Sequence, residues 1–159
     1  MAQSTVTDED LAALVRRTAE AASALISGDV RRYFALIPHA EDFTLMNPFG
    51  GEPARGADTS PAGLDAQERF FTGPGEAELE VAQAYASGDL AVLAVIERQR
   101  GVVGGLPEQD LSLRVTLVFR REGAEWRLVH RHADPLVHPI GLEQLAALLR
   151  GGPPSSRGA

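Results

Sequence analysis

Two acidic residues in the C-terminal half of the sequence occupy positions from which a carboxylate could move a proton. Glu97 directly follows the apolar run Leu90–Ile96, and Asp134 follows two histidines, His130 and His132, at the end of an alternating stretch. Desolvation raises the pKa of a buried carboxyl group, and enzymes use this effect to prepare general acids and bases. Glu97 is therefore a candidate catalytic residue.

An ion pair is the competing interpretation of Glu97. The residues after it, Arg98 to Arg100, are polar, so Glu97 could sit at the mouth of a sheet and pair with Arg114 or Arg98. If it enters a partly desolvated cavity instead, Arg114 on another strand is its natural partner, and such a pair is costly to break from one side.

Several other polar and aromatic residues could orient a ligand. Arg114 and Thr116 share one strand face, and an arginine there could neutralise an enolate or a carboxylate. Asn47 and Phe49 lie in a turn-like Asn-Pro-Phe-Gly-Gly segment, and Tyr33 either lines the pocket or packs its ring in the core. We expect these five residues to contribute to ligand binding.

A metal site is not expected. His130 and His132 point the same way on a strand, but only Asp134 is near them, and a metal site needs three or four ligands. The chain has no cysteine, which also excludes disulfides and thiol nucleophiles. We expect no cofactor.

Helical signals dominate the first half of the sequence. Thr7 followed by three acids predicts a helix start, and apolar residues recur at helical spacing up to Ile26, before Gly28. A short second helix ends at Pro38, and Ser60-Pro61 opens a third that Gly73-Pro74-Gly75 closes. A last short helix is predicted over Leu142 to Leu149.

From Ala77 the period changes to two. Strands are predicted near 79–85, 90–100, 111–119 and 126–133, joined by the turns Ser87-Gly88-Asp89 and Glu122-Gly123. Hairpin-joined strands after a group of helices predict an α+β domain with a curved antiparallel sheet, spanning residues 1–150 and followed by a disordered tail at 151–159. Strict alternation by itself puts apolar residues inside and polar residues outside.

Composition excludes some partners. The chain of 159 residues has a net charge of -7, whereas nucleic-acid binding needs clustered Lys and Arg, so no nucleic-acid partner is expected. There is no secretory signal in Met1 to Asp10 and no apolar run of roughly 20 residues, so we expect a cytoplasmic protein without membrane contact.

Two stretches of the sequence resemble the nuclear-transport-factor-2-like superfamily. Within Ala24–Gly56, A-L-I-S-G-D-V and F-T-L-M-N-P-F-G-G-E-P-A-R-G are similar to bacterial ketosteroid isomerases. Within Leu113–Leu136, L-R-V-T-L-V-F-R-R-E-G-A-E-W-R-L-V-H-R-H-A-D-P-L resembles the SnoaL-like and kinase-association branches. The resemblance implies a cone-like half-barrel with N-terminal helices closing a pocket, and a polar concave face, which would place Arg114 and Thr116 in that pocket.

The isomerase residues of this superfamily are replaced here. The position of the general base, before the proline, is Asn47, and the position of the oxyanion tyrosine is Ala21. The second oxyanion donor of these isomerases is an aspartic acid on a late strand. The corresponding strand here, residues 111–119, has only Ser112, Arg114 and Thr116 as polar residues. The resemblance therefore does not imply steroid isomerisation.

The other two branches suggest different roles. SnoaL-like cyclases carry an aspartate base in W-x-x-x-D followed by G-L and Q-L, to which His130-x-x-x-Asp134, Gly141-Leu142 and Gln144-Leu145 are similar. The resemblance implies that Asp134 is a candidate catalytic base, and His132 beside it is a further candidate catalytic residue. The kinase-association branch lines its pocket with arginines that bind anions. The corresponding positions here are Glu97 and Ala133, so this anion-binding pattern is not reproduced.

Two functions follow as hypotheses. The first is a pocket protein for a small hydrophobic or carbonyl-containing ligand, acting as an isomerase, cyclase or dehydratase by proton transfer. The alternative is a non-catalytic ligand-binding or assembly module with a vestigial pocket. Alternating strands with Leu113, Val115, Leu117, Phe119 and Trp126 carry more apolar surface than short helices cover, so we also expect a homodimer.

Overall fold

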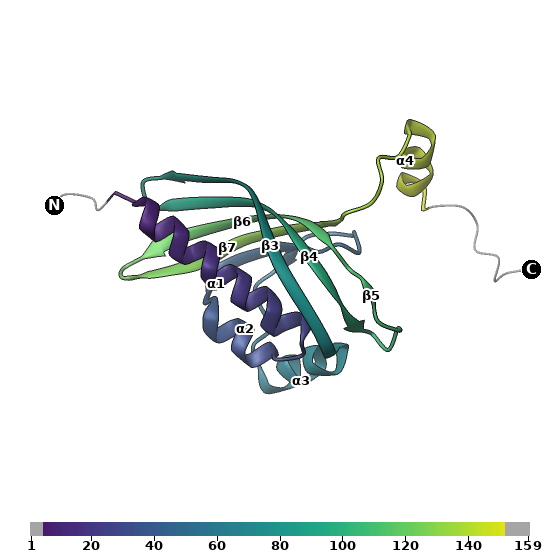
Figure 1. Cartoon of the computed structure of the whole chain (residues 1–159), viewed down its shortest axis with the longest axis horizontal. Helices are drawn as coiled ribbons and strands as arrows, with labels where there is room; N and C mark the ends of the chain where they lie inside the picture. The colour runs from purple at the N-terminus through teal and green to yellow at the C-terminus, as the bar shows by residue number, and fades with distance from the viewer. Residues whose placement is uncertain (1–4, 152–159) are drawn as a thin grey trace, which may run out of the picture.

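The computed structural model describes residues 5–151, drawn in colour in Figure 1. Its elements follow in chain order: α1 (Asp8–Ile26), α2 (Val30–Leu36), β1 (His39–Met46), β2 (Ala54–Arg55), α3 (Pro61–Phe70), β3 (Phe71–Ser87), β4 (Leu90–Val103), β5 (Gln109–Asp110), β6 (Leu113–Glu122), β7 (Glu125–Pro135) and α4 (Leu142–Leu149). The α+β class and the curved sheet are confirmed. Beyond Gly151, the expected tail lies outside the described residues.

The seven strands form one sheet in the order β2-β1-β7-β6-β4-β3, with β5 paired to β4. The long hairpins β3–β4 and β6–β7 are antiparallel, but β1 runs parallel to β7. The sheet is therefore mixed and not wholly antiparallel as expected. No tight turn joins β1 to β7, so hairpin geometry does not fix their relative direction.

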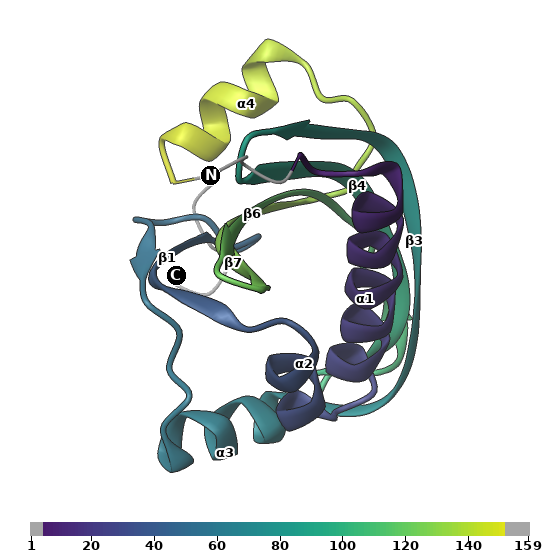
Figure 2. The same cartoon turned by 90° about the vertical axis from the view of Figure 1, so that its left-hand side faces the viewer.

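Helix α1 covers the concave face of the sheet, as Figure 2 shows from the side. Thr7 and Asp10 form the capping box at its start, which satisfies two orphan backbone N–H groups. Its buried side chains include Leu14, Thr18 and Ala21, which face β3 and β4. Helix α2 packs beside α1, so the helices close the concave side while the convex side of the sheet stays bare.

The concave face of the sheet is apolar. Val115, Leu117 and Phe119 are at most 3% exposed and belong to one core cluster with α1 and α2. Our expectation that these residues need a dimer partner to cover them is wrong, because the helices cover them within the chain. Arg114 and Thr116 alternate with them and so face outward; placing these two in the pocket was also wrong, and alternation alone gave the correct facing.

Strand β3 begins at Phe71 and runs through Gly73-Pro74-Gly75, which the sequence predicted to be a break. The last turn of α1 crosses the sheet here. A Cβ at Gly75 would lie 2.5 Å from the Ile26 carbonyl oxygen, and one at Gly101 would lie 2.8 Å from Ile26 Cγ1. These glycines are therefore needed for close helix–sheet approach, and the strand continues past them.

No helix among residues 5–151 is long and apolar enough to cross a membrane.

We expect Gly75→Ala to lower the free energy of unfolding by about 1–3 kcal/mol, because the new methyl group meets backbone that cannot move aside cheaply. The matched control is Gly141→Ala, where a Cβ meets nothing within 4 Å and the change should stay within about 0.5 kcal/mol. Urea unfolding followed by circular dichroism measures both. Equal stability of the two variants would contradict the proposed close approach.

Candidate functional site

A buried ion pair occupies the concave interior of the sheet. Arg131 Nη1 donates to Glu97 Oε1 at 2.7 Å, and Arg131 Nη2 donates to Glu97 Oε2 at 2.8 Å. The two side chains are 14% and 4% exposed, respectively. This two-pronged arrangement satisfies both carboxylate oxygens, which is the geometry that makes an arginine–carboxylate pair strong.

The strands explain how this pair forms. Glu97 follows Ala91, Leu93 and Val95 on the inward face of β4 and is buried, which is one of the two alternatives that the sequence left open. The prediction that Glu97 pairs with Arg114 is wrong, because the Arg114 side chain points to the other face of the sheet. Arg131 reaches Glu97 from β7, across the intervening strand β6.

A β-bulge turns Arg131 inward. On β6, Val118 pairs with His130 and the next residue, Phe119, pairs with Leu128, so Val129 is an extra residue on β7. A bulge shifts the side-chain phase of a strand by one residue. Strict alternation would have placed His130 with Leu128 on the inner face; after the bulge, Arg131 takes that face.

Tyr33 and His39 pack close to the ion pair. The Tyr33 ring lies 5.0 Å from the Phe34 ring and 5.6 Å from the His39 ring, measured between centroids. Burial raises the pKa of the Tyr33 hydroxyl, while the nearby Arg131 and Glu97 act on it in opposite directions. Tyr33 therefore lies in the interior next to the charges.

The electrostatics of this interior favour ionised Arg131 and neutral His39. Burial tends to lower the pKa of Arg131, but the charge and hydrogen bonds of Glu97 outweigh it and hold that pKa above its ordinary value. Burial lowers the pKa of His39, against the hydrogen bond between Nδ1 and the Ile37 carbonyl oxygen at 2.8 Å.

The structure brings three other predicted residues together, but on the convex surface. Arg114 Nη2 donates to Asp134 Oδ2 at 3.2 Å, and His132 Nε2 lies 3.2 Å from Asp134 Oδ1. Arg114 is 65% exposed and Asp134 44%, and Thr116 pairs beside them with His132 across β6 and β7. Arg114, His132 and Asp134 are thus side chains on an exposed surface of the described chain.

Asn47 and Phe49 lie in the turn after β1, away from the buried pair. Asn47 Oδ1 accepts a hydrogen bond from the Phe49 backbone N at 2.9 Å, so the amide stabilises its own turn. Phe49 is 80% exposed, and its ring lies 6.2 Å from the Phe70 ring, measured between centroids. The predicted ligand residues are therefore divided between interior, convex face and rim.

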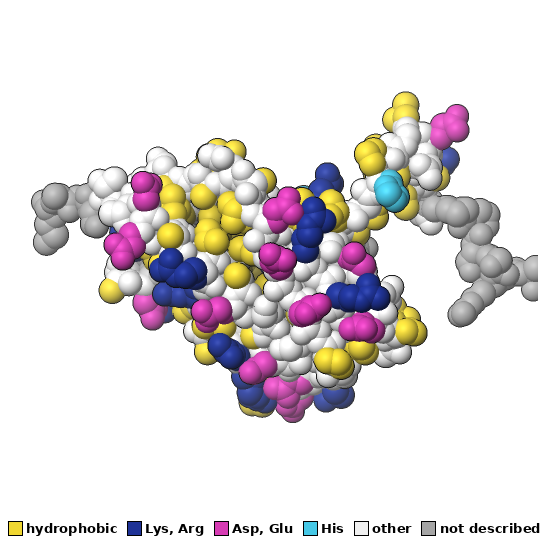
Figure 3. All heavy atoms as spheres, in the orientation of Figure 1, with side chains coloured by type: hydrophobic (Ala, Val, Ile, Leu, Met, Phe, Trp, Pro, Cys, Tyr) yellow, Lys and Arg dark blue, Asp and Glu magenta, His cyan; other side chains and the backbone are white. Residues whose placement is uncertain are grey.

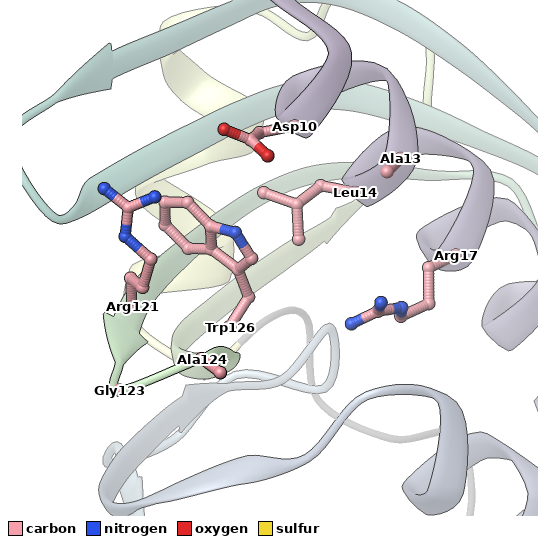
Figure 4. A pocket seen from close by; sticks show the side chains of 8 residues that line it. All are labelled: Asp10, Ala13, Leu14, Arg17, Arg121, Gly123, Ala124 and Trp126. Carbon is pink, nitrogen blue, oxygen red and sulfur yellow. The ribbon is translucent and has the colours of Figure 1, made fainter. Parts of the chain in front are cut away.

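A cavity of about 390 Å³ lies between the N-terminal half of α1 and the β6–β7 hairpin. It is lined by Asp10, Ala13, Leu14, Arg17, Arg121, Gly123, Ala124 and Trp126, and Figure 4 shows these side chains meeting from the two walls. The guanidinium of Arg121 lies 5.2 Å from the centroid of the Trp126 ring, a cation–π distance. The volume of this cavity is at the lower end of the range for small-molecule sites.

The sequence analysis did not select Arg17 or Arg121. Helical spacing does place Asp10, Leu14 and Arg17 on one face of α1, so half of the cavity wall was visible in the pattern. Its other half comes from a hairpin more than 100 positions later in the chain. Only the folded arrangement shows that the two walls meet.

Among residues 5–151, no group of three or more His, Asp or Glu side chains is placed to hold a metal ion.

The family model for the SnoaL-like domain matches residues 15–137, which is more than half of the chain. The chain belongs to the SnoaL-like domain family. Helix α4 lies beyond the matched stretch. No protein of curated function matches this SnoaL-like chain in sequence.

Solved structures share the fold of this SnoaL-like domain. A proposed dehydratase of the NTF2-like family from Streptomyces avermitilis matches with a TM-score of 0.64 and 20% identity, over 82% of this chain and 99% of its own. An NTF2-like protein of unknown function from Pseudomonas putida KT2440 matches with a TM-score of 0.62 and 24% identity, over 87% and 92%. The CaMKII hub of S. rosetta matches with a TM-score of 0.59 and 20% identity, over 78% and 95%. Together with the SnoaL-like family match, these structures confirm the predicted nuclear-transport-factor-2-like superfamily.

We expect Arg131→Met to lower the free energy of unfolding by about 3–5 kcal/mol, because it leaves the Glu97 carboxylate buried without a partner. The same substitution at the exposed Arg114 is the matched control and should cost about 0–1 kcal/mol. In Glu97→Gln/Arg131→Met the loss should be smaller than the sum of the single losses. Equal losses for the two arginine variants in urea melts would show that the interior pair is not buried in solution.

Stability should depend on pH through His39. Because burial lowers its native pKa, the unfolded chain takes up a proton first as the pH falls, and the free energy of unfolding should decrease from neutral pH through the unfolded pKa of about 6.5. His39→Phe should flatten this slope between pH 7.5 and 5. Four carboxyl groups also have lowered pKa values, but they titrate below this pH range and do not contribute to the slope: Asp10, Asp42, Asp58 and Asp110. An unchanged slope in His39→Phe would contradict this assignment.

Proposed function

We propose that this SnoaL-like protein binds a small organic molecule, with an apolar ring and an anionic or carbonyl oxygen, in the cavity between α1 and the β6–β7 hairpin. The supporting observation is the combination of Leu14 and Trp126 as apolar walls with Arg17, which reaches toward Trp126 from α1 (Figure 4). Within the described chain, Arg17 has no hydrogen bond or ion pair, so its guanidinium is available to an anionic oxygen.

Binding without catalysis is the function that we infer for this site. Isomerase, cyclase or dehydratase chemistry needs a base beside the ligand, and both predicted bases are engaged elsewhere: Glu97 by Arg131 in the interior, and Asp134 by Arg114 on the convex face. The cavity itself contributes one carboxyl group, Asp10. A hydrogen bond from the Thr7 backbone N, at 2.8 Å, lowers the pKa of this carboxyl and makes it a weak base.

Trp126 offers a direct test, because it is the only tryptophan of the chain and lines the cavity. We expect 3-phenylpropionate, and larger aryl carboxylates of the same kind, to change its fluorescence in a saturable way and to raise the melting temperature. The uncharged amide of each acid should bind more weakly. Loss of the charge-assisted hydrogen bond in Arg17→Ala should weaken carboxylate binding by about tenfold or more.

Arg16→Ala is the matched control, since Arg16 is the exposed neighbour of Arg17 on α1 and does not line the cavity. It should leave carboxylate binding unchanged. If no aryl carboxylate or aryl ketone gives a saturable signal at millimolar concentration, or if Arg16→Ala and Arg17→Ala weaken binding equally, the proposed site is wrong.

A further inference from the structure

The C-terminal helix α4 is not packed on the body of the protein. Figures 1 and 2 show that residues 136–141 carry it away from the sheet. Within residues 5–151, no hydrogen bond or ion pair joins α4 to another element; its bonds, such as Leu145 N to Gly141 O, are local. In the space-filling view of Figure 3 it stands apart with hydrophobic side chains on its surface. We call residues 136–149 the C-terminal arm.

The C-terminal arm exposes an unusual amount of apolar surface. Six of its side chains are between 42% and 80% exposed: Val137, Ile140, Leu142, Leu145, Leu148 and Leu149. Leu142, Leu145 and Leu149 follow helical spacing and form one stripe of α4. An isolated helix of only eight residues is marginal in water, so α4 needs a surface that covers this stripe.

The convex face of the sheet carries a second uncovered apolar surface. Tyr85 on β3 pairs with Val92 on β4, and Val92 pairs with Val118 on β6, so the three side chains are cross-strand neighbours on one face. Tyr85 is 56% exposed, and Leu90, two residues from Val92 on the same face, is 45% exposed. We call Tyr85, Leu90, Val92 and Val118 the convex patch.

From these two surfaces we infer that α4 of one chain packs on the convex patch of a second copy, and that the exchange is reciprocal. Each copy carries both a donor and an acceptor surface, which is what a two-fold symmetric contact requires. The exchange forms the same contact twice, so each copy covers both its exposed leucine stripe and its convex patch. Residues 138–149 of the arm lie beyond the stretch that the family model matches.

Light scattering coupled to size exclusion tests the exchange on the full chain. We expect about twice the chain mass of 17.0 kDa at tens of micromolar. Leu145→Glu/Leu149→Glu in the arm, and separately Tyr85→Glu in the convex patch, should each reduce the mass to that of one chain. Glu143→Lys, a charge change off the leucine stripe of α4, is the matched control and should remain dimeric. Circular dichroism of the sheet confirms that each variant is folded.

A mixing experiment separates arm exchange from other modes of dimerisation. A dimer of the arm variant has no intact C-terminal arm, and a dimer of the patch variant has no intact convex patch. Neither variant can therefore form an arm–patch contact with itself. When the two variants are mixed, the intact arm of the patch variant can pack on the intact convex patch of the arm variant. A heterodimer of about twice the chain mass should then appear.

Three outcomes overturn the inference: a full chain that stays monomeric at about 100 micromolar, a dimer that survives the arm variant, or a mixture that stays monomeric. The first outcome includes the case in which α4 folds back on its own chain.

Discussion

The bidentate pair between Glu97 and Arg131 is the constraint on which the interior of this protein depends. Removing two charges from water costs several kcal/mol for each ion, and only close, well-aligned contacts offset that cost. Here both carboxylate oxygens are engaged at 2.7 and 2.8 Å. Because the partners come from β4 and β7, the pair requires the intervening strand β6 to keep its register with both neighbours. The fold therefore tolerates little slippage between these strands.

The same pair decides which chemistry the interior can support. Each carboxylate oxygen of Glu97 accepts a hydrogen bond from Arg131, so the charges of the pair balance within the protein. Tyr33 and His39, which pack nearby, are also held away from their charged forms by burial. The interior thus acts as structure, and the ligand site that we propose, with Arg17 and Trp126, lies outside it. Proteins that share this fold can differ in chemistry for this reason, since function depends on the site and not on the scaffold.

Apolar surface is divided unequally between the two faces of the sheet. The concave face is covered by α1 and α2 and holds the core, including Leu93, Leu117 and Leu128. The convex face has no helix over it, and the apolar arm ends the described chain. Stability is therefore provided by one side of the sheet, which leaves the other side free for contact with another molecule.

The sequence by itself determined the local elements. Hydroxyl caps at Thr7 and Ser60, helical periodicity and the final Leu142–Leu149 segment gave helices that the structure contains at those places. Alternation along β6 correctly predicted which residues share a face, and the apolar run before Glu97 made its burial one of two alternatives. These features depend on neighbours a few positions apart, which a sequence displays directly.

Tertiary structure alone decided the partner of Glu97, the direction of β1 and the walls of the cavity. The clearest case is Arg131, which strict alternation assigns to the face opposite Leu128. A single extra residue, Val129, shifts the phase of β7 and turns Arg131 into the core. Nothing in the local pattern of residues marks that bulge, because it is set by the pairing of β7 with β6. Contacts between strands distant in sequence fix the register, and the register decides which charged side chain is buried.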